Sequence, residues 1–131
     1  MIGLATNIVV RYLVQDDPIQ SARATDLVEG RLTERDPGFI SLVAIAEIAW
    51  VLERSYRFAA RDIANAIERL LQADLLVVEA EQPVFTAMVA LKEGRGTFAD
   101  ALIGALNARA GCPRTLTFDR KALRLNGFEL A

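Results

Sequence analysis

Met1-Ile2-Gly3-Leu4-Ala5-Thr6-Asn7 opens the chain and decides how the rest of it is interpreted. Residues 1–4 are few and apolar, which predicts a buried, central strand. Thr6 or Asn7 can then cap a helix that begins directly after this strand. A strand that turns straight into a helix leaves its carboxyl end open, and ligands collect there in open α/β folds. Ala5 occupies that position, where a polar side chain would be most useful.

Composition narrows the possible chemistry. The chain has 131 residues, 53% of them hydrophobic, which predicts one well-packed globular domain over residues 1–131. It contains no histidine, and this excludes Ser-His-Asp and Cys-His nucleophilic sites and most zinc sites. Any catalysis must therefore use carboxylates, lysine or arginine, hydroxyl groups, or a hard metal ion bound through oxygen.

The sequence also indicates where the protein works. The single cysteine, Cys112, cannot form an internal disulfide, which fits a reducing compartment. No basic segment precedes an apolar one at the start of the chain, so no signal peptide is expected. The longest apolar region, 42–52, is too short for a membrane span and is interrupted by Glu47. We therefore expect a soluble, cytoplasmic protein that does not enter a membrane.

The charged residues allow two interpretations. The formal net charge is −2, so no overall basic field indicates nucleic-acid binding. Thirteen of the fifteen basic residues are arginine. That bias is typical of a GC-rich genome or of salt-bridged surfaces, and it also suits bidentate recognition of phosphate.

Short apolar segments alternate with helical patterns along the whole chain. Strands are predicted at 1–4, 39–40, 75–78, 115–118 and 128–130, and helices after residue 6 and at 18–35, 42–54, 61–73, 83–92 and 98–110, with a short helical turn at 119–123. This alternation predicts an α/β fold, specifically a three-layer α/β/α sandwich around a mostly parallel sheet of four to five strands.

Glu47 is the most unusual single residue. It is one carboxylate among the apolar residues of the helix predicted over 42–54, and a helix that is apolar on nearly every side is expected to be buried. An unpaired buried carboxylate is unfavourable, so Glu47 must be neutralised, paired or bound to a cation. A structural salt bridge to an arginine, a rim position that faces water and a functional site are all compatible with this position.

Two further acids follow predicted structural elements. Asp100 lies three residues after Thr97, an acidic form of the capping box. Asp119 follows the strand at 115–118 and can cap the next helical turn. If that strand lies beside the first one, Asp119 faces Ala5. Three carboxylates on three elements, in a chain without histidine, suit Mg²⁺ or Mn²⁺ and not zinc.

Together these segments resemble the PIN-domain ribonucleases, and within them the VapC-type toxins of bacterial toxin–antitoxin pairs. The resemblance covers essentially the whole chain, and its motifs occur in the family's order and spacing. It is densest in four segments, Ile2–Asn7 with Val10–Leu13, Ser41–Leu52, Phe98–Ile103 and Thr115–Lys121.

The resemblance implies an acidic site that binds Mg²⁺ or Mn²⁺ and hydrolyses RNA phosphodiesters. Glu47, Asp100 and Asp119 match three of its catalytic and metal-binding positions. The fourth position is an aspartate in the pattern Asp-Thr-Asn, where this chain reads Ala5-Thr6-Asn7. Ala5 therefore marks a missing ligand, and the two residues after it are expected to support the site.

Activity of this chain is expected to be impaired by the missing carboxylate. Three explanations fit Ala5: a substitution introduced to disarm a toxic nuclease, a natural relative that has lost activity, or a variant that recovers the metal ion through a water molecule. Arg95, Arg120 and Lys121 flank the motifs and are the expected contacts to RNA phosphates.

The resemblance also implies partners. A cognate antitoxin protein, an RNA substrate and a second copy of the chain in a homodimer are expected. The alternative to the ribonuclease is a PIN-like module that no longer cleaves and acts only by binding an antitoxin or RNA.

Overall fold

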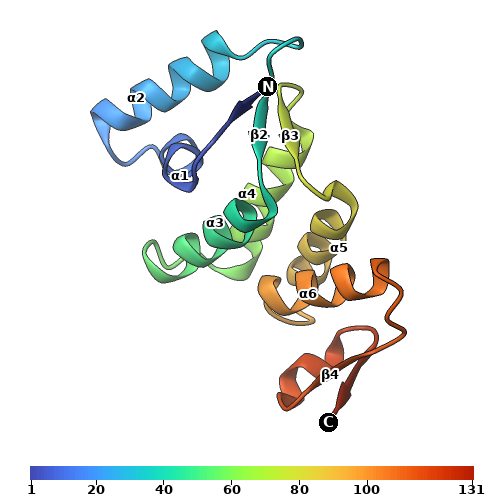
Figure 1. The fold of residues 1–131 in the computed structure, drawn as a ribbon. Helices are drawn as coiled ribbons and strands as arrows, with labels where there is room; N and C mark the ends of the chain where they lie inside the picture. Colours follow the sequence, from blue (N-terminus) through green and yellow to red (C-terminus); the bar gives the residue numbers. More distant parts are fainter.

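Five short strands, each parallel to its neighbour, organise the chain in the computed structural model, which describes residues 1–131 (Figure 1). Six α-helices connect and flank them. The elements in chain order are β1 (Ile2–Gly3), α1 (Thr6–Val14), α2 (Pro18–Asp26), the π-helical η1 (Leu27–Arg31), β2 (Gly38–Ile40), α3 (Leu42–Arg54), α4 (Ala60–Gln72), β3 (Leu76–Val78), α5 (Glu81–Lys92), α6 (Phe98–Arg109), β4 (Thr115–Thr117), the 3₁₀-helical η2 (Arg120–Arg124) and β5 (Phe128–Leu130).

The expected α/β fold with parallel strands is confirmed, but the strands form two sheets instead of one. The first sheet has the order β1-β2-β3, and β4 pairs only with β5 in a second sheet. The first strand was predicted to be central, and this was wrong: β1 is an edge strand, and Gly3 is exposed. Sequence apolarity indicated burial of the strand but carried no information about its neighbours.

Side-chain caps begin two of the four helices that directly follow strands, α3 and η2, whereas α1 and α5 begin without one. The Ser41 hydroxyl accepts a hydrogen bond from the Ala44 N–H at 3.2 Å and starts α3 at Leu42, as predicted. The start of α1 differs from the prediction, because the capping position is Ala5 and no side chain completes the cap. In the β1–β2 register Gly3 lies opposite Phe39, so Ala5 and Ser41 occupy equivalent positions two residues beyond the paired strands.

Helix α3 is not buried on all sides, which corrects the prediction. Its buried face carries Ile45, Ile48 and Leu52, whereas Glu47 is exposed. Val43 and Trp50 lie one turn before and after Glu47 along the helix and are 79% and 58% exposed. An apolar composition therefore concealed an ordinary two-sided helix whose outer face is partly hydrophobic.

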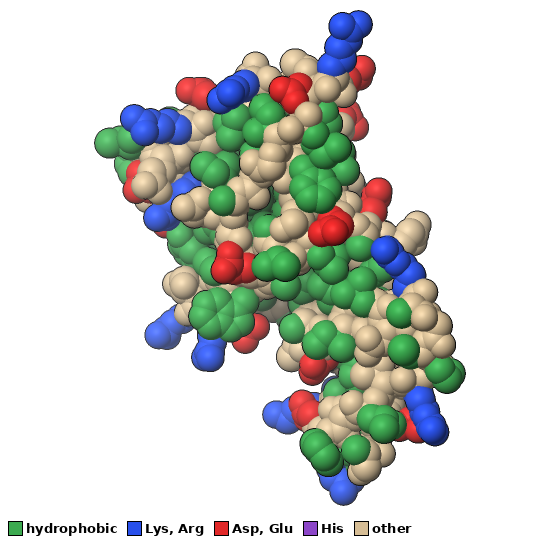
Figure 2. All heavy atoms as spheres, viewed as in Figure 1, with side chains coloured by type: hydrophobic (Ala, Val, Ile, Leu, Met, Phe, Trp, Pro, Cys, Tyr) green, Lys and Arg blue, Asp and Glu red, His purple; other side chains and the backbone are tan.

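The segment from β4 to β5 forms a separate lobe at the end of the molecule opposite β1 (Figure 1). Figure 2 shows this lobe as a narrow projection with apolar side chains on its surface. The lobe packs on α6 and on the loop before it: a Cβ added to Gly104 would lie 2.5 Å from Phe128 Cε1, and one added to Gly96 would lie 2.8 Å from Leu125 Cδ1. Phe128 of β5 and Leu125, the residue after η2, thus fill the space that these two glycines leave.

This arrangement exposes more surface than a compact chain of the same size. The accessible area is 8062 Å², whereas a compact monomer of 14.4 kDa exposes about 6,800 Å². No helix is both long enough and apolar enough to cross a bilayer.

Substitution at Gly38 tests the packing under the first sheet. A Cβ there would lie 2.9 Å from Leu32 Cδ1, 2.9 Å from Leu4 Cδ1 and 3.0 Å from Leu76 Cδ2. Three side chains would have to shift together, so Gly38→Ala should lower the free energy of unfolding by about 1–3 kcal/mol. Urea denaturation measures the change.

Gly30→Ala is the matched control for this substitution. No atom lies within 4 Å of the added Cβ, and the reduced entropy of the unfolded chain should leave stability unchanged or raised by up to about 1 kcal/mol. Equal losses in the two variants would contradict the packing explanation.

Candidate functional site

The acidic residues singled out from the sequence lie in two separate clefts. The first cleft, of about 390 Å³, is lined by Ala5, Thr6 and Asn7 from the start of α1 and by Glu47 from α3. The carboxyl end of β1 and the exposed face of α3 meet here. Glu47 is exposed and forms no ion pair, so the expected burial and the structural salt bridge are both wrong, and the water-facing position that the sequence also allowed is the one observed.

The second cleft, of about 630 Å³, holds the other two acids. Asp100 comes from the first turn of α6, and Asp119 lies two residues after β4, directly before η2. Four cationic side chains line the same cleft: Arg95, Arg120, Lys121 and Arg124. An acidic pair therefore lies inside a largely basic rim.

Local hydrogen bonds hold the Asp119 side chain and the Asp100 backbone of the second cleft in place. Asp119 caps η2, because its Oδ1 accepts the Lys121 backbone N–H at 2.9 Å. The Asp100 backbone N–H donates to the Thr97 hydroxyl at 3.1 Å, which starts α6 as predicted. The Asp119 carboxylate thus has a structural role and keeps Oδ2 free of hydrogen bonds within the chain, whereas Asp100 takes part only through its backbone and keeps both carboxylate oxygens free.

The cationic side chains of this rim differ in whether they form an ion pair. Arg95 pairs with Glu93 at 2.8 Å, so its guanidinium group is already engaged. Arg120, Lys121 and Arg124 form no ion pair. Their charges are uncompensated by direct contact and face solvent, where they can bind an anion.

The three predicted carboxylates do not gather within one chain. No group of three or more acidic, cysteine or histidine residues is close enough to hold a metal ion. The reason is topological: Asp119 would face Ala5 only if β4 lay beside β1, and β4 pairs only with β5.

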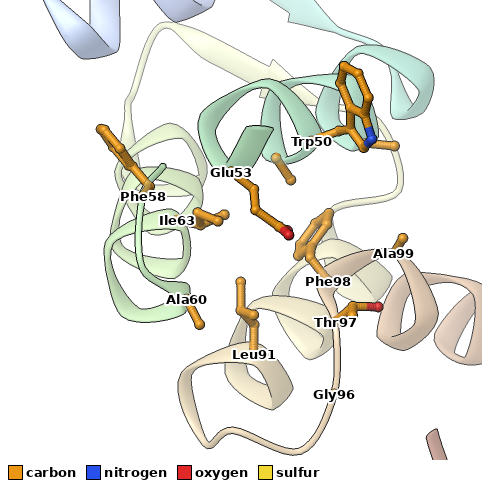
Figure 3. A pocket seen from close by; sticks show the side chains of 12 residues that line it. Trp50, Glu53, Phe58, Ala60, Ile63, Leu91, Gly96, Thr97, Phe98 and Ala99 are labelled. Atoms are coloured by element: carbon orange, nitrogen blue, oxygen red, sulfur yellow. The ribbon is translucent and has the colours of Figure 1, made fainter. Parts of the chain in front are cut away.

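An apolar pocket of about 360 Å³ lies between α3 and the start of α6 (Figure 3). Trp50 and Glu53 line it from α3, and Phe98 and Ala99 from α6. In Figure 3 the Glu53 side chain points into the pocket towards Phe98. The helix that carries Glu47 and the helix that carries Asp100 are therefore separated by a hollow at this point.

A polar network beside the first cleft was not singled out from the sequence. Arg11 and Tyr56 line that cleft, and both bind Asp16: Arg11 Nη1 donates to Asp16 Oδ1 at 2.8 Å, and the Tyr56 hydroxyl donates to Asp16 Oδ2 at 2.8 Å. The bonds from Tyr56 and then Arg11 lower the pKa of the Asp16 carboxyl group, and the bond to Asp16 raises the pKa of Tyr56. Only the position of Arg11, one helical turn after Asn7, offered a signal for this network.

Comparison with known proteins gives two findings. A family model described as PIN domain matches residues 4–127 of the chain. A VapC ribonuclease of Aquifex aeolicus (strain VF5) is 28% identical over 91 residues, which are 70% of this chain and 67% of the relative. The family match spans both clefts.

The network predicts a specific acid response. Tyr56→Phe removes the hydroxyl donor, so the pKa of Asp16 should rise towards its ordinary value of about 3.9. Because the folded-state pKa lies below the unfolded one, this contact stabilises the fold above the unfolded pKa, and its contribution is lost as pH falls through the folded value. The parent chain should therefore lose more stability than the variant on acidification, as measured by carboxyl ¹³C titration together with denaturation at several pH values.

Tyr12→Phe serves as the control, because the Tyr12 hydroxyl binds Glu29 and not Asp16. It should leave the pKa of Asp16 unchanged. A pKa shift of the same size in both variants would contradict the conclusion that the Tyr56 hydroxyl lowers the pKa of Asp16.

Proposed function

The chain belongs to the PIN domain family, and from this premise we propose that it is a toxin-type ribonuclease that hydrolyses RNA phosphodiesters. The similarity to a VapC ribonuclease over 70% of the chain supports the substrate class. The proposal includes a cognate antitoxin and a homodimer as partners, and Glu47, Asp100 and Asp119 as the catalytic acids.

The observation that carries the proposal is the composition of the second cleft. Two carboxylates lie among cations that have no acidic partner, Arg120 and Lys121 among them. A purely acidic cleft would repel the RNA backbone, and a purely basic one would bind it without chemistry. Cations at the rim can hold phosphate oxygens and orient the chain of nucleotides, while acids lie next to the bond to be broken.

Metal dependence is part of the proposal, and the donor chemistry fits it. Only oxygen donors are offered, and Mg²⁺ and Mn²⁺ prefer such donors. The placement in one chain does not fit, because Glu47 lies in one cleft and Asp100 and Asp119 lie in another. A single chain thus presents an incomplete set of ligands.

Ala5 favours a second candidate function. It lies beside Glu47 in the first cleft and supplies no charge where the family has an aspartate. A PIN-like module that binds RNA or an antitoxin without cleaving would need the rim cations but not the acids.

Restoring the carboxylate separates the two candidates. Ala5→Asp should raise the rate of RNA cleavage with Mg²⁺ or Mn²⁺ by at least about tenfold, since even outer-shell partners of a metal site typically contribute 10- to 100-fold. Cleavage of a labelled single-stranded RNA, with and without a chelator, measures the effect.

Ala5→Asn has a similar shape but no charge and should leave the rate near that of the parent chain. Absence of metal-dependent cleavage by Ala5→Asp, in a protein that still binds RNA, would support the binding module and contradict the ribonuclease.

Arg120→Ala and Lys121→Ala test the contacts to phosphate. Each should weaken RNA binding at low salt and reduce the slope of log K against log salt by about 0.7, the value for one contact to a single strand. Fluorescence anisotropy over a salt series provides the slope. Arg35→Ala is the control, because Arg35 is an exposed cation outside both clefts. An equal change in its salt slope would mean that RNA responds to the total charge of the protein and not to cations at the second cleft.

A further inference from the structure

The outer edge of β1 has backbone groups without strand partners. Ile2 and Leu4 donate to the Pro37 and Phe39 carbonyls of the β2 side at 2.8 and 2.9 Å. Because alternate residues of a parallel strand face opposite neighbours, the N–H and C=O of Gly3 point away from β2. No strand lies on that side.

The outer edge of β4 has the complementary arrangement. Thr115 donates to the Gly127 carbonyl at 2.7 Å, and Thr117 accepts from the Ala131 N–H at 2.9 Å. The alternate residues, Leu116 and Phe118, therefore turn their backbone groups away from β5 to a side without a strand. Such open edges are templates for pairing with another strand.

The two edges fit each other in one register. In a parallel pair Gly3 can bond to the Leu116 carbonyl and the Phe118 N–H, which places it opposite Thr117. The residues at the helix-capping positions favour this register over one shifted along the strand. In the β1–β2 register Ala5 lies opposite Ser41, and both occupy the capping position of the helix that follows their strand. Asp119 occupies the same position before η2. Gly3 opposite Thr117 places Asp119 beside Ala5.

Burial supports the same pairing. Phe118 is 90% exposed and Leu116 59% exposed, which is unusual for two large apolar side chains on one strand. Register neighbours share a sheet face, so Leu116 would lie next to Ile2, and Phe118 next to Leu4. Leu4 belongs to the buried face of the first sheet, together with Ile40 and Val78. The pairing would continue that buried face onto the exposed residues.

The structure favours β4 of a second copy, and not the chain's own β4, as the strand that pairs with the open edge of β1. Phe128 packs on α6 and Leu125 on the loop before it, and this places the β4–β5 lobe at the end of the molecule opposite β1 (Figures 1 and 2). The surface in excess of a compact monomer is about 1,200 Å² per chain. Two chains that bury this excess would form an interface of about 2,400 Å², within the range of obligate dimers.

We propose that two copies of this chain exchange their β4–β5 lobes: each β4 adds to the free edge of the other copy's β1, which gives two five-stranded parallel sheets, each built from both copies. The exchange joins Ala5 and Glu47 of one copy to Asp100 and Asp119 of the other. The acidic site is thus completed between chains, a statement that rests on the proposed function, whereas the strand pairing does not.

Disulfide mapping tests the pairing directly. In a Cys112→Ser background, one chain carries Gly3→Cys and another Thr117→Cys; the two are refolded together and oxidised. A mixed inter-chain disulfide is expected, since register neighbours lie within bridging distance. Val77→Cys on the outer strand β3, mixed with Thr117→Cys, is the control and should not form one.

Two outcomes of this experiment overturn the proposal. One is equal cross-linking in the control mixture, which would mean that β4 has no preference for β1. The other is an intramolecular disulfide in dilute chains that carry both Gly3→Cys and Thr117→Cys, which would mean that each chain closes on itself.

The mass in solution gives an independent readout. Light scattering should return twice the chain mass of 14.4 kDa for the parent chain and for Gly3→Ala, whose added Cβ meets no atom within 4 Å. Gly3→Pro, which removes the outward N–H, and Phe118→Asp, which alters a side chain exposed in the single chain, should both give monomers with unchanged circular dichroism.

The outcomes separate this proposal from the proposed function. A parent chain that is monomeric at high micromolar concentration, or a Phe118→Asp protein that remains dimeric, contradicts the exchange whatever the activity. A cross-linked dimer whose Ala5→Asp form cleaves no RNA upholds the strand exchange and contradicts the ribonuclease.

Discussion

The need of every strand for hydrogen-bond partners on both edges governs this structure. Backbone N–H and C=O groups that leave water must be paired, and a parallel sheet meets this need only for its inner strands. Here β2 alone has two neighbours. The outer edge of β1 and the outer edge of β4 remain open; Ala5 follows β1 and shares a cleft with Glu47 of α3, whereas Asp119 follows β4 and shares a cleft with Asp100 of α6. The separation of the site into two clefts and the large exposed area both follow from the same division of strands into two sheets.

Local sequence signals predicted most of the elements correctly. Ser41 places the start of α3 and Thr97 the start of α6, because a hydroxyl cap acts on backbone only three residues away. Burial was harder to predict. Residues 42–52 are so rich in apolar side chains that the pattern could not indicate which side of α3 packs inward. The helix was expected to be buried, and a water-facing position was only one of the alternatives for Glu47, which is exposed. Likewise, the apolar start of the chain indicated a strand but could not reveal whether β1 was central or at an edge.

The identities of the candidate site residues could be predicted, but their positions relative to one another could not. Glu47 and Asp119 are separated by 72 positions. The distance between them in space depends on the direction that the chain takes from α6 into β4, which no local sequence pattern encodes. The contact between Asp16 and Tyr56 is hidden for the same reason, since it joins residues 40 positions apart. The type of each candidate residue was therefore predictable from the sequence, whereas contacts between residues far apart in the chain were not.

The bare cap of α1 has a further consequence for the acidic site. Asp119 illustrates what a carboxylate does at such a position: Oδ1 accepts the N–H of Lys121 and is held in one orientation, while Oδ2 accepts no bond within the chain. An aspartate at position 5 would divide its two oxygens in the same way, one fixed by the first turn of α1 and the other directed outward. The helix would then preorganise a ligand before any cation arrived. Ala5 lacks this orienting device as well as the negative charge.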